Sequence, residues 1–126
     1  MKLRIKGNSL RLRIAPSEMA RLLESGRVEE TIHFGAGRDE SLTYALEHAA
    51  NAGSLGVRYQ PARVTVVLSS AEARDWARGD AVGVYGAVEV GAAHLEIAVE
   101  KDWACLDKSA AENRDTFPNP SPGANC

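Results

Sequence analysis

The residues best suited to chemistry gather in one short stretch, which directly follows an alternating apolar segment. This stretch holds an indole, a thiol and two carboxylates: Asp102, Trp103, Cys105 and Asp107. Thiolate and carboxylate groups are ligands for a transition metal such as zinc. The second thiol, Cys126, follows a proline-rich segment that is long enough to bring it back to Cys105. One hypothesis is therefore a metal or small-ligand site, with or without catalysis, formed by Cys105, Asp107 and Cys126 with a histidine supplied by the fold.

No catalytic motif accompanies these residues. The histidines, His33, His48 and His94, have no metal-ligand spacing to one another or to a cysteine. The sequence also lacks a phosphate-binding loop, a nucleophile elbow and an HExxH motif. A cysteine beside a tryptophan is most often a small buried apolar residue. The sequence therefore favours a binding or interaction module that is not an enzyme and has no cofactor, and the metal site is the alternative.

The strongest electrostatic feature is a basic face on the first two predicted strands. Five basic residues and no acidic ones occur in the first 14 positions: Lys2, Arg4, Lys6, Arg11 and Arg13. We take Arg4, Arg11 and Arg13, together with Trp103, as candidate binding residues, because arginine binds anions well. The sequence favours pairing of this face with acidic strand faces that carry Glu29, Glu47, Glu96 and Glu100, and anion binding is the alternative. No aromatic residue is interleaved with the basic ones to stack on a base, so nucleic acid is not an expected partner.

Composition places the chain among soluble globular domains. It has 126 residues, of which 44% are hydrophobic and 25% charged, and no apolar run is long enough to span a membrane. The net charge of -2 indicates neither a nucleic-acid nor a membrane partner. The first residues are too charged for a signal peptide, so we expect a cytoplasmic protein. Self-association through exposed strand edges or the basic face is the partner interaction that we consider.

Apolar alternation and helix-end signals predict the secondary structure. We expect strands over residues 2–6, 10–14, 28–34, 42–47, 64–68, 82–90 and 95–99, and helices over 16–26 and 71–78. Residues 42–48 also have helix-forming composition, but Tyr44 on the face of Leu42 and Leu46 favours a strand. Residues 49–56 read as a loop of small residues.

The second half of the sequence repeats the pattern of the first. Val64, Val66 and Leu68 follow Leu10, Leu12 and Ile14 by 54 positions (64 minus 10), and the same offset places Trp76 on Leu22. We therefore expect an internal duplication of a strand-helix-strand-strand unit, over about residues 10–48 and 64–103. The predicted fold class is α+β, either a mostly antiparallel sheet or a barrel-like structure with two short helices. Residues 1–107 would form one domain, and residues 108–126 an extended proline-rich tail that packs on it through Phe117.

Several segments resemble a small family of uncharacterised bacterial proteins. The resemblance is carried by residues 1–13 (MKLRIKGNSLRLR), 42–46 (LTYAL), 100–103 (EKDW), 105–106 (CL) and 117–120 (FPNP). It implies a bacterial cytoplasmic setting and a tail that is a regular part of the protein. It implies no activity and no functional residue.

Overall fold

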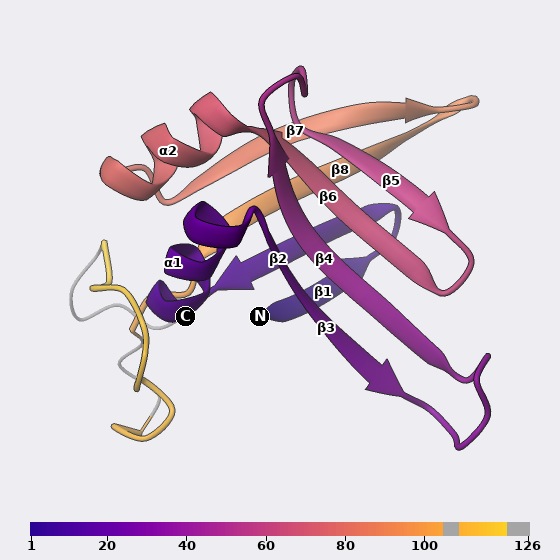
Figure 1. Cartoon of the computed structure of the whole chain (residues 1–126), viewed down its shortest axis with the longest axis horizontal. Helices are drawn as coiled ribbons and strands as arrows, with labels where there is room; N and C mark the ends of the chain where they lie inside the picture. Colours follow the sequence, from indigo (N-terminus) through magenta and orange to yellow (C-terminus); the bar gives the residue numbers. More distant parts are fainter. Residues whose placement is uncertain (105–108, 121–126) are drawn as a thin grey trace.

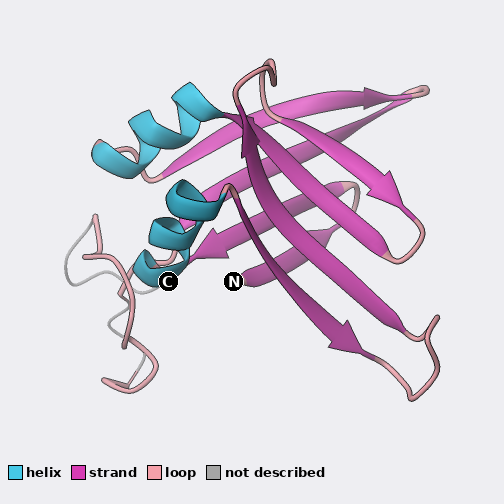
Figure 2. Ribbon diagram, in the orientation of Figure 1, coloured by secondary structure: helices cyan, strands magenta, loops and turns pink. Residues whose placement is uncertain are grey.

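The computed structural model describes residues 1–104 and 109–120. Within them, two helices and eight strands follow one another along the chain (Figures 1 and 2). Their bounds are β1 (Lys2–Lys6), β2 (Ser9–Ile14), α1 (Pro16–Ser25), β3 (Arg27–His33), β4 (Ser41–Ala49), β5 (Gly56–Gln60), β6 (Arg63–Ser69), α2 (Ser70–Arg78), β7 (Gly83–Val90) and β8 (Ala93–Lys101).

The strands of the described residues form two four-stranded sheets, in the orders β1-β2-β8-β7 and β3-β4-β6-β5. Each sheet consists of two antiparallel hairpins, one from each half of the chain, and the hairpins join through a parallel central pair, β2 with β8 and β4 with β6. The α+β prediction is confirmed, and residues 42–47 form a strand. The two sheets do not close into a barrel. The parallel central pairs were not predicted, because they join segments that lie far apart in the sequence.

Both helices lie at the same end of the two sheets (Figure 1). Helix α1 ends at Ser25 and is capped by Gly26, whose φ of 84° is left-handed and therefore suits glycine. Helix α2 begins after Ser69, whose side chain accepts a hydrogen bond of 3.1 Å from the backbone N–H of Glu72. Leu22 and Trp76 are buried at 0% and 2% exposure, so each helix turns its apolar stripe toward the sheets.

The core lies between the inner faces of the two sheets and beneath the helices. Leu12 pairs with Val99 in one sheet, and Val66 pairs with Leu46 in the other. All four side chains are at most 1% exposed. Because side chains alternate along a strand, burial of these residues turns their polar neighbours to the outer faces.

The topology fits a duplicated unit. The order β1-β2-α1-β3-β4 is followed by β5-β6-α2-β7-β8, so each strand of one sheet has an equivalent in the other. The repeated unit is longer than predicted, because β5 precedes β6 as β1 precedes β2. We predicted no strand over β5, where only Val57 and Tyr59 give an apolar alternation. The equivalence places Arg58 at the position of Arg4, and Glu47 at that of Glu100.

Candidate functional site

The basic residues of the first hairpin lie on the outer face of the β1-β2-β8-β7 sheet. Across this face, Arg4 of β1 pairs with Arg11 of β2, Arg11 with Ala98 of β8, and Ala98 with Tyr85 of β7. The row therefore runs from two guanidinium groups over a small methyl group to an aromatic ring. The register brings Arg4 and Arg11 together, as the predicted hairpin requires.

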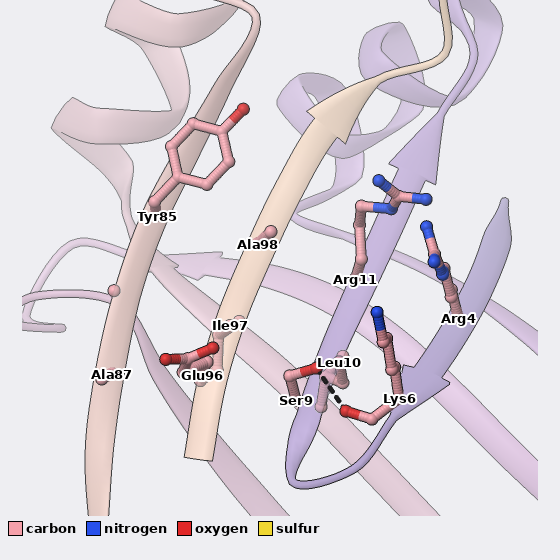
Figure 3. Close-up of a pocket in the computed structure, with 11 residues that line it drawn as sticks. Arg4, Lys6, Ser9, Leu10, Arg11, Tyr85, Ala87, Glu96, Ile97 and Ala98 are labelled. Atoms are coloured by element: carbon pink, nitrogen blue, oxygen red, sulfur yellow. Dashed lines mark hydrogen bonds between the residues drawn. The ribbon is translucent and has the colours of Figure 1, made fainter. Parts of the chain in front are cut away.

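This row crosses a groove of about 440 Å³ (Figure 3). The groove is lined by Arg4, Lys6, Ser9, Leu10, Arg11, Tyr85, Gly86, Ala87, Glu96, Ile97 and Ala98. In Figure 3 the basic side chains of Arg4, Lys6 and Arg11 stand on one side, and Tyr85 stands on the other. The small side chains of Ala87 and Ala98 leave the space between them open.

A buried carboxylate organises one end of the groove. Glu100 is 8% exposed, and it accepts a hydrogen bond of 2.7 Å from the hydroxyl of Tyr85. The same side chain lies 3.3 Å from Arg13 Nε and 3.6 Å from Arg11 Nη1. Gly83 leaves the room for this contact, because a Cβ there would lie 3.0 Å from the Tyr85 hydroxyl and 2.5 Å from the Val99 carbonyl oxygen. Burial of a charged group that is paired on several sides fixes its partners in place.

Trp103 extends this network to the end of the last strand. The guanidinium carbon of Arg13 lies 4.4 Å from the centre of the Trp103 ring, which is within the range of a cation-π contact. Beside it, the backbone of Phe117 accepts a hydrogen bond of 2.6 Å from Ala104 N–H and donates one of 2.8 Å to the Asp102 carbonyl. The structure thus brings Arg11, Arg13 and Trp103 into one connected group.

The groove retains positive charge that the described residues do not neutralise. Within residues 1–104 and 109–120, Arg4 and Lys6 form no ion pair. Burial and the neighbouring charges of Arg13 and Arg4 together lower the pKa of Arg11, although Glu100 acts in the opposite direction. The single negative charge of Glu100 therefore does not balance the positive charges of Arg4, Arg11 and Arg13.

The equivalent face of the other sheet has a different charge balance. There Arg58, which corresponds to Arg4, lies 3.2 Å from Glu47, and Arg27 lies 3.0 Å from Glu47 and 2.9 Å from Glu29. Burial lowers the pKa of Arg27, but the hydrogen bonds that Arg27 donates to Glu29 and Glu47, and the charges of these two residues, outweigh it, so the net shift is upward. The central Ala45, which corresponds to Ala98, is 1% exposed.

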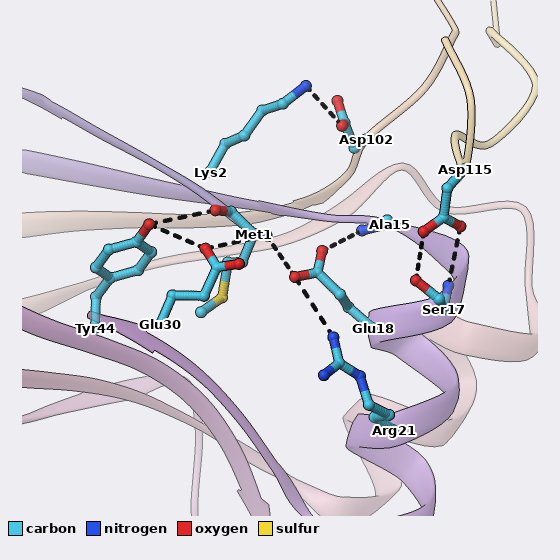
Figure 4. Close-up of polar contacts among 10 residues, drawn as sticks. All are labelled: Met1, Lys2, Ala15, Ser17, Glu18, Arg21, Glu30, Tyr44, Asp102 and Asp115. Carbon is cyan, nitrogen blue, oxygen red and sulfur yellow. Dashed lines mark hydrogen bonds and ion pairs between the residues drawn. The ribbon is translucent and has the colours of Figure 1, made fainter. Parts of the chain in front are cut away.

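A second polar cluster joins the start of the chain to α1 and to the end of β8 (Figure 4). The amino group of Met1 forms an ion pair with Glu18, a buried residue that also caps α1 by accepting from Ala15 N–H. Lys2 Nζ lies 2.8 Å from Asp102 Oδ2, so Lys2 is neutralised outside the groove. The other carboxylate oxygen, Asp102 Oδ1, is buried without a hydrogen-bond partner in the described part of the chain. We assign this cluster a structural role.

The metal-site hypothesis falls on residues outside the described ones. Cys105, Asp107 and Cys126 all lie there, and within residues 1–104 and 109–120 no three potential ligands gather around one point. The Nδ1 atom of His48 lies 2.8 Å from Ser70 Oγ, and His94 lies 2.9 Å from Glu89 on the surface.

Sequence reasoning missed Tyr85 as a site residue and considered Glu100 only as a charge partner. The alternation of side chains along the strand could have identified Tyr85 as an outward residue. Val84 and Val88 face inward, so Tyr85 between them must face outward. Its place beside the basic face depends on the parallel pairing of β2 with β8, which no local pattern reveals.

The fold and the groove define an α+β domain of two mixed sheets with a basic outer face. The chain belongs to DUF7009, a family of unknown function, whose model matches residues 1–121. No curated protein and no solved structure matches it. None of the helices in the described part of the chain is long and apolar enough to cross a membrane.

Proposed function

We propose that this protein is a non-catalytic binding module, and that its ligand is a small anion held in the groove on the outer face of the β1-β2-β8-β7 sheet. The observation that carries the proposal is the unneutralised charge of Arg4 and Lys6 on one wall of the groove. The comparison of the two sheets strengthens this observation. The equivalent arginine on the other sheet, Arg58, is paired with Glu47.

The chemistry of the groove suits a carboxylate or phosphate group. Guanidinium groups donate two parallel hydrogen bonds to either anion, and such charge-assisted bonds are stronger than neutral ones. Arg4 and Arg11 are cross-strand neighbours, so one anion can reach both. The groove volume of about 440 Å³ falls in the range of pockets that hold small molecules.

The groove is also organised in advance of binding. Arg11 is held beside Glu100, and Arg13 is held between Glu100 and the ring of Trp103. A site whose side chains are already in place loses less conformational entropy on binding. The candidate binding residues Arg4, Arg11, Arg13 and Trp103 thus have two roles in the proposal, because Arg4 and Arg11 contact the anion while Arg13 and Trp103 position their neighbours.

Isothermal titration calorimetry with inorganic pyrophosphate at ~50 mM salt tests the proposal. We expect the double variant Arg4→Ala, Lys6→Ala to bind pyrophosphate at least about tenfold more weakly, since hydrogen bonds to charged groups contribute about 1.5–3 kcal/mol each. Arg58→Ala is the matched control, because it removes the equivalent arginine from the neutralised face. The proposal is wrong if the wild-type protein does not bind pyrophosphate, or if the Arg58 variant loses as much affinity as the double variant.

Self-association is a second function that one observation favours. Ile5 and Tyr59 occupy equivalent positions on the edge strands β1 and β5, with their side chains on the inner side, and they are 66% and 72% exposed. Large exposed apolar side chains on edge strands are a common basis of contact between copies. Sedimentation of the wild type beside the double variant Ile5→Ser, Tyr59→Ser tests this. A monomer at all concentrations in the wild type would rule it out.

A further inference from the structure

The groove has an aromatic wall as well as a basic one. Tyr85 is 59% exposed on the outer face of β7, one position across from Ala98 and two from Arg11. Its hydroxyl is bound to the buried Glu100, so the ring is held in one place while its face stays open. Figure 3 shows this ring nearly face-on, across the groove from Arg11 and Arg4.

Small residues form the floor of the groove between its aromatic and basic walls. Ala98 separates Tyr85 from Arg11, and it stays partly exposed, whereas the equivalent Ala45 is covered and 1% exposed. The wall strands β7 and β2 are two strand spacings apart, about 10 Å. This distance suits a single ring with an anionic group attached to it.

The charges along the groove give such a ligand an orientation. Glu96 lies at the end of the groove near Ala87, away from Arg11 and Arg4 (Figure 3). An anionic group is repelled from the Glu96 end and attracted to the arginine end. The ring of the ligand then lies over Tyr85, the exposed aromatic surface of the groove. Stacking on an aromatic side chain is favourable for any planar ring.

We propose that the ligand carries its phosphate or carboxylate group on a planar ring, which stacks on Tyr85 while the anionic group binds Arg4 and Arg11. Aryl phosphates and aromatic carboxylates belong to this class. The inference rests on the proposed anion-binding function and adds to it the nature of the group that bears the charge. The hydrogen bond to Glu100 makes Tyr85 a fixed surface, so stacking requires no reorganisation of the side chain.

A pair of probes that differ only in planarity tests the inference. Phenyl phosphate and cyclohexyl phosphate have the same charge and similar size, but only the first has an aromatic face. We expect phenyl phosphate to bind the wild-type protein about threefold to tenfold more tightly, which corresponds to the 0.5–1.5 kcal/mol of an aromatic pair. Tyr85→Leu should abolish this difference, and Tyr85→Phe should retain most of it. Arg4→Ala should weaken both phosphates by the same factor.

Benzoate and cyclohexanecarboxylate form the second arm of the test, which separates carboxylate from phosphate recognition. Preference for the ring in either pair supports the inference and identifies the anionic group. Equal affinities within both pairs, with pyrophosphate binding still dependent on Arg4 and Lys6, would overturn the inference and leave the proposed function intact. Failure to bind pyrophosphate and all four probes would overturn both. Thermal unfolding of the Tyr85 variants shows whether they fold, and the exposed position of this ring leads us to expect that they do.

Discussion

The hydroxyl of Tyr85 donates a 2.7 Å hydrogen bond to Glu100, and this bond joins the aromatic wall of the groove to its basic wall. Glu100 is 8% exposed and also lies beside Arg11 and Arg13. One buried carboxylate therefore positions the ring on one strand and two guanidinium groups on another. A substitution of Glu100 should therefore change the positions of side chains on both walls of the groove.

The ionisation of Tyr85 should reveal this bond. Partial burial, followed by the hydrogen bond to Glu100 and the charge of Glu100, raises the pKa of Tyr85 from 10.0 to about 12. Because the pKa is higher in the folded protein, the contribution of Tyr85 to stability is complete below pH 10.0 and is lost as the pH rises toward about 12. We expect the phenolate absorbance of Tyr85 to appear only near the upper end of this range.

Two variants isolate that signal. The difference between the titrations of the wild type and Tyr85→Phe belongs to Tyr85, even though burial also raises the pKa of Tyr44. Glu100→Gln removes the negative charge, so it should return the pKa of Tyr85 toward 10.0. A Tyr85 that titrates near 10.0 in the wild type would show that its hydroxyl is not bound to Glu100 in solution.

Trp76 should contribute strongly to the stability of the core. It is 2% exposed, and its ring N–H donates a 3.1 Å hydrogen bond to the carbonyl of Val82. We expect Trp76→Ala to lower the free energy of unfolding by about 3–5 kcal/mol in chemical denaturation. Leu22→Ala, at the equivalent position in α1, should cost about 2–5 kcal/mol. Leu23→Ala is the control. Leu23 is 37% exposed, so this substitution should lower the free energy of unfolding by much less than Leu22→Ala. A change below about 1 kcal/mol for Trp76 would contradict its burial.

Local patterns were sufficient to predict nearly all of the secondary structure. Alternation in a strand has a period of two, so Leu10 and Leu12 fixed which side of β2 is buried and therefore placed Arg11 outside. The short turn at Gly7, with a φ of 55°, fixed the pairing of Arg4 with Arg11. The shared basic face could therefore be predicted from residues close together in the sequence.

The aromatic side of the groove could not be predicted in this way. Tyr85 reaches Arg11 only through the parallel pairing of β2 with β8, which joins the two halves of the chain. Strand order is set by burial summed over both sheets, and a single segment carries little information about it. The strand β5 was missed for a related reason, since its two apolar residues, Val57 and Tyr59, give too short an alternation.

Duplex nucleic acid remains an unexpected partner for the basic face. The positive charge of the face is concentrated in a small groove, and Glu96 lies at one end of that groove. We expect no binding of duplex DNA or RNA in an electrophoretic shift experiment at ~50 mM salt, where phosphate contacts are strongest. Micromolar binding that weakens steeply with salt would contradict this expectation. Arg4→Ala and Arg58→Ala would then show which face is responsible.

Metal analysis addresses the alternative site. We expect no stoichiometric transition metal in the purified protein, because the proposed groove functions without one. A metal that is retained by the wild type and lost from Cys105→Ser would support the metal-site hypothesis on Cys105, Asp107 and Cys126 instead. The matched control is His94→Ala, since His94 is an exposed residue that pairs with Glu89.

Phe117 should hold residues 109–120 against the end of β8. Its backbone N–H donates to the carbonyl of Asp102 at 2.8 Å, and its carbonyl accepts from Ala104 N–H at 2.6 Å. Its ring is partly buried against the core, and Lys101 Nζ lies 5.5 Å from the ring centre. Because the ring of Phe117 is only partly buried, we expect Phe117→Ala to lower the free energy of unfolding by about 1–2 kcal/mol, less than the loss of a fully buried aromatic ring.

Phe34 provides the matched control, since it is the other phenylalanine of the chain and is 71% exposed on a hairpin. Phe34→Ala should leave the unfolding midpoint nearly unchanged. If packing of Phe117 alone holds the segment, neither a reductant nor a chelator should change the stability of the full chain. A loss of stability on adding either reagent, equal to the loss in Phe117→Ala, would instead indicate that Cys105 and Cys126 meet, because a disulfide or a shared metal would then be what secures the tail.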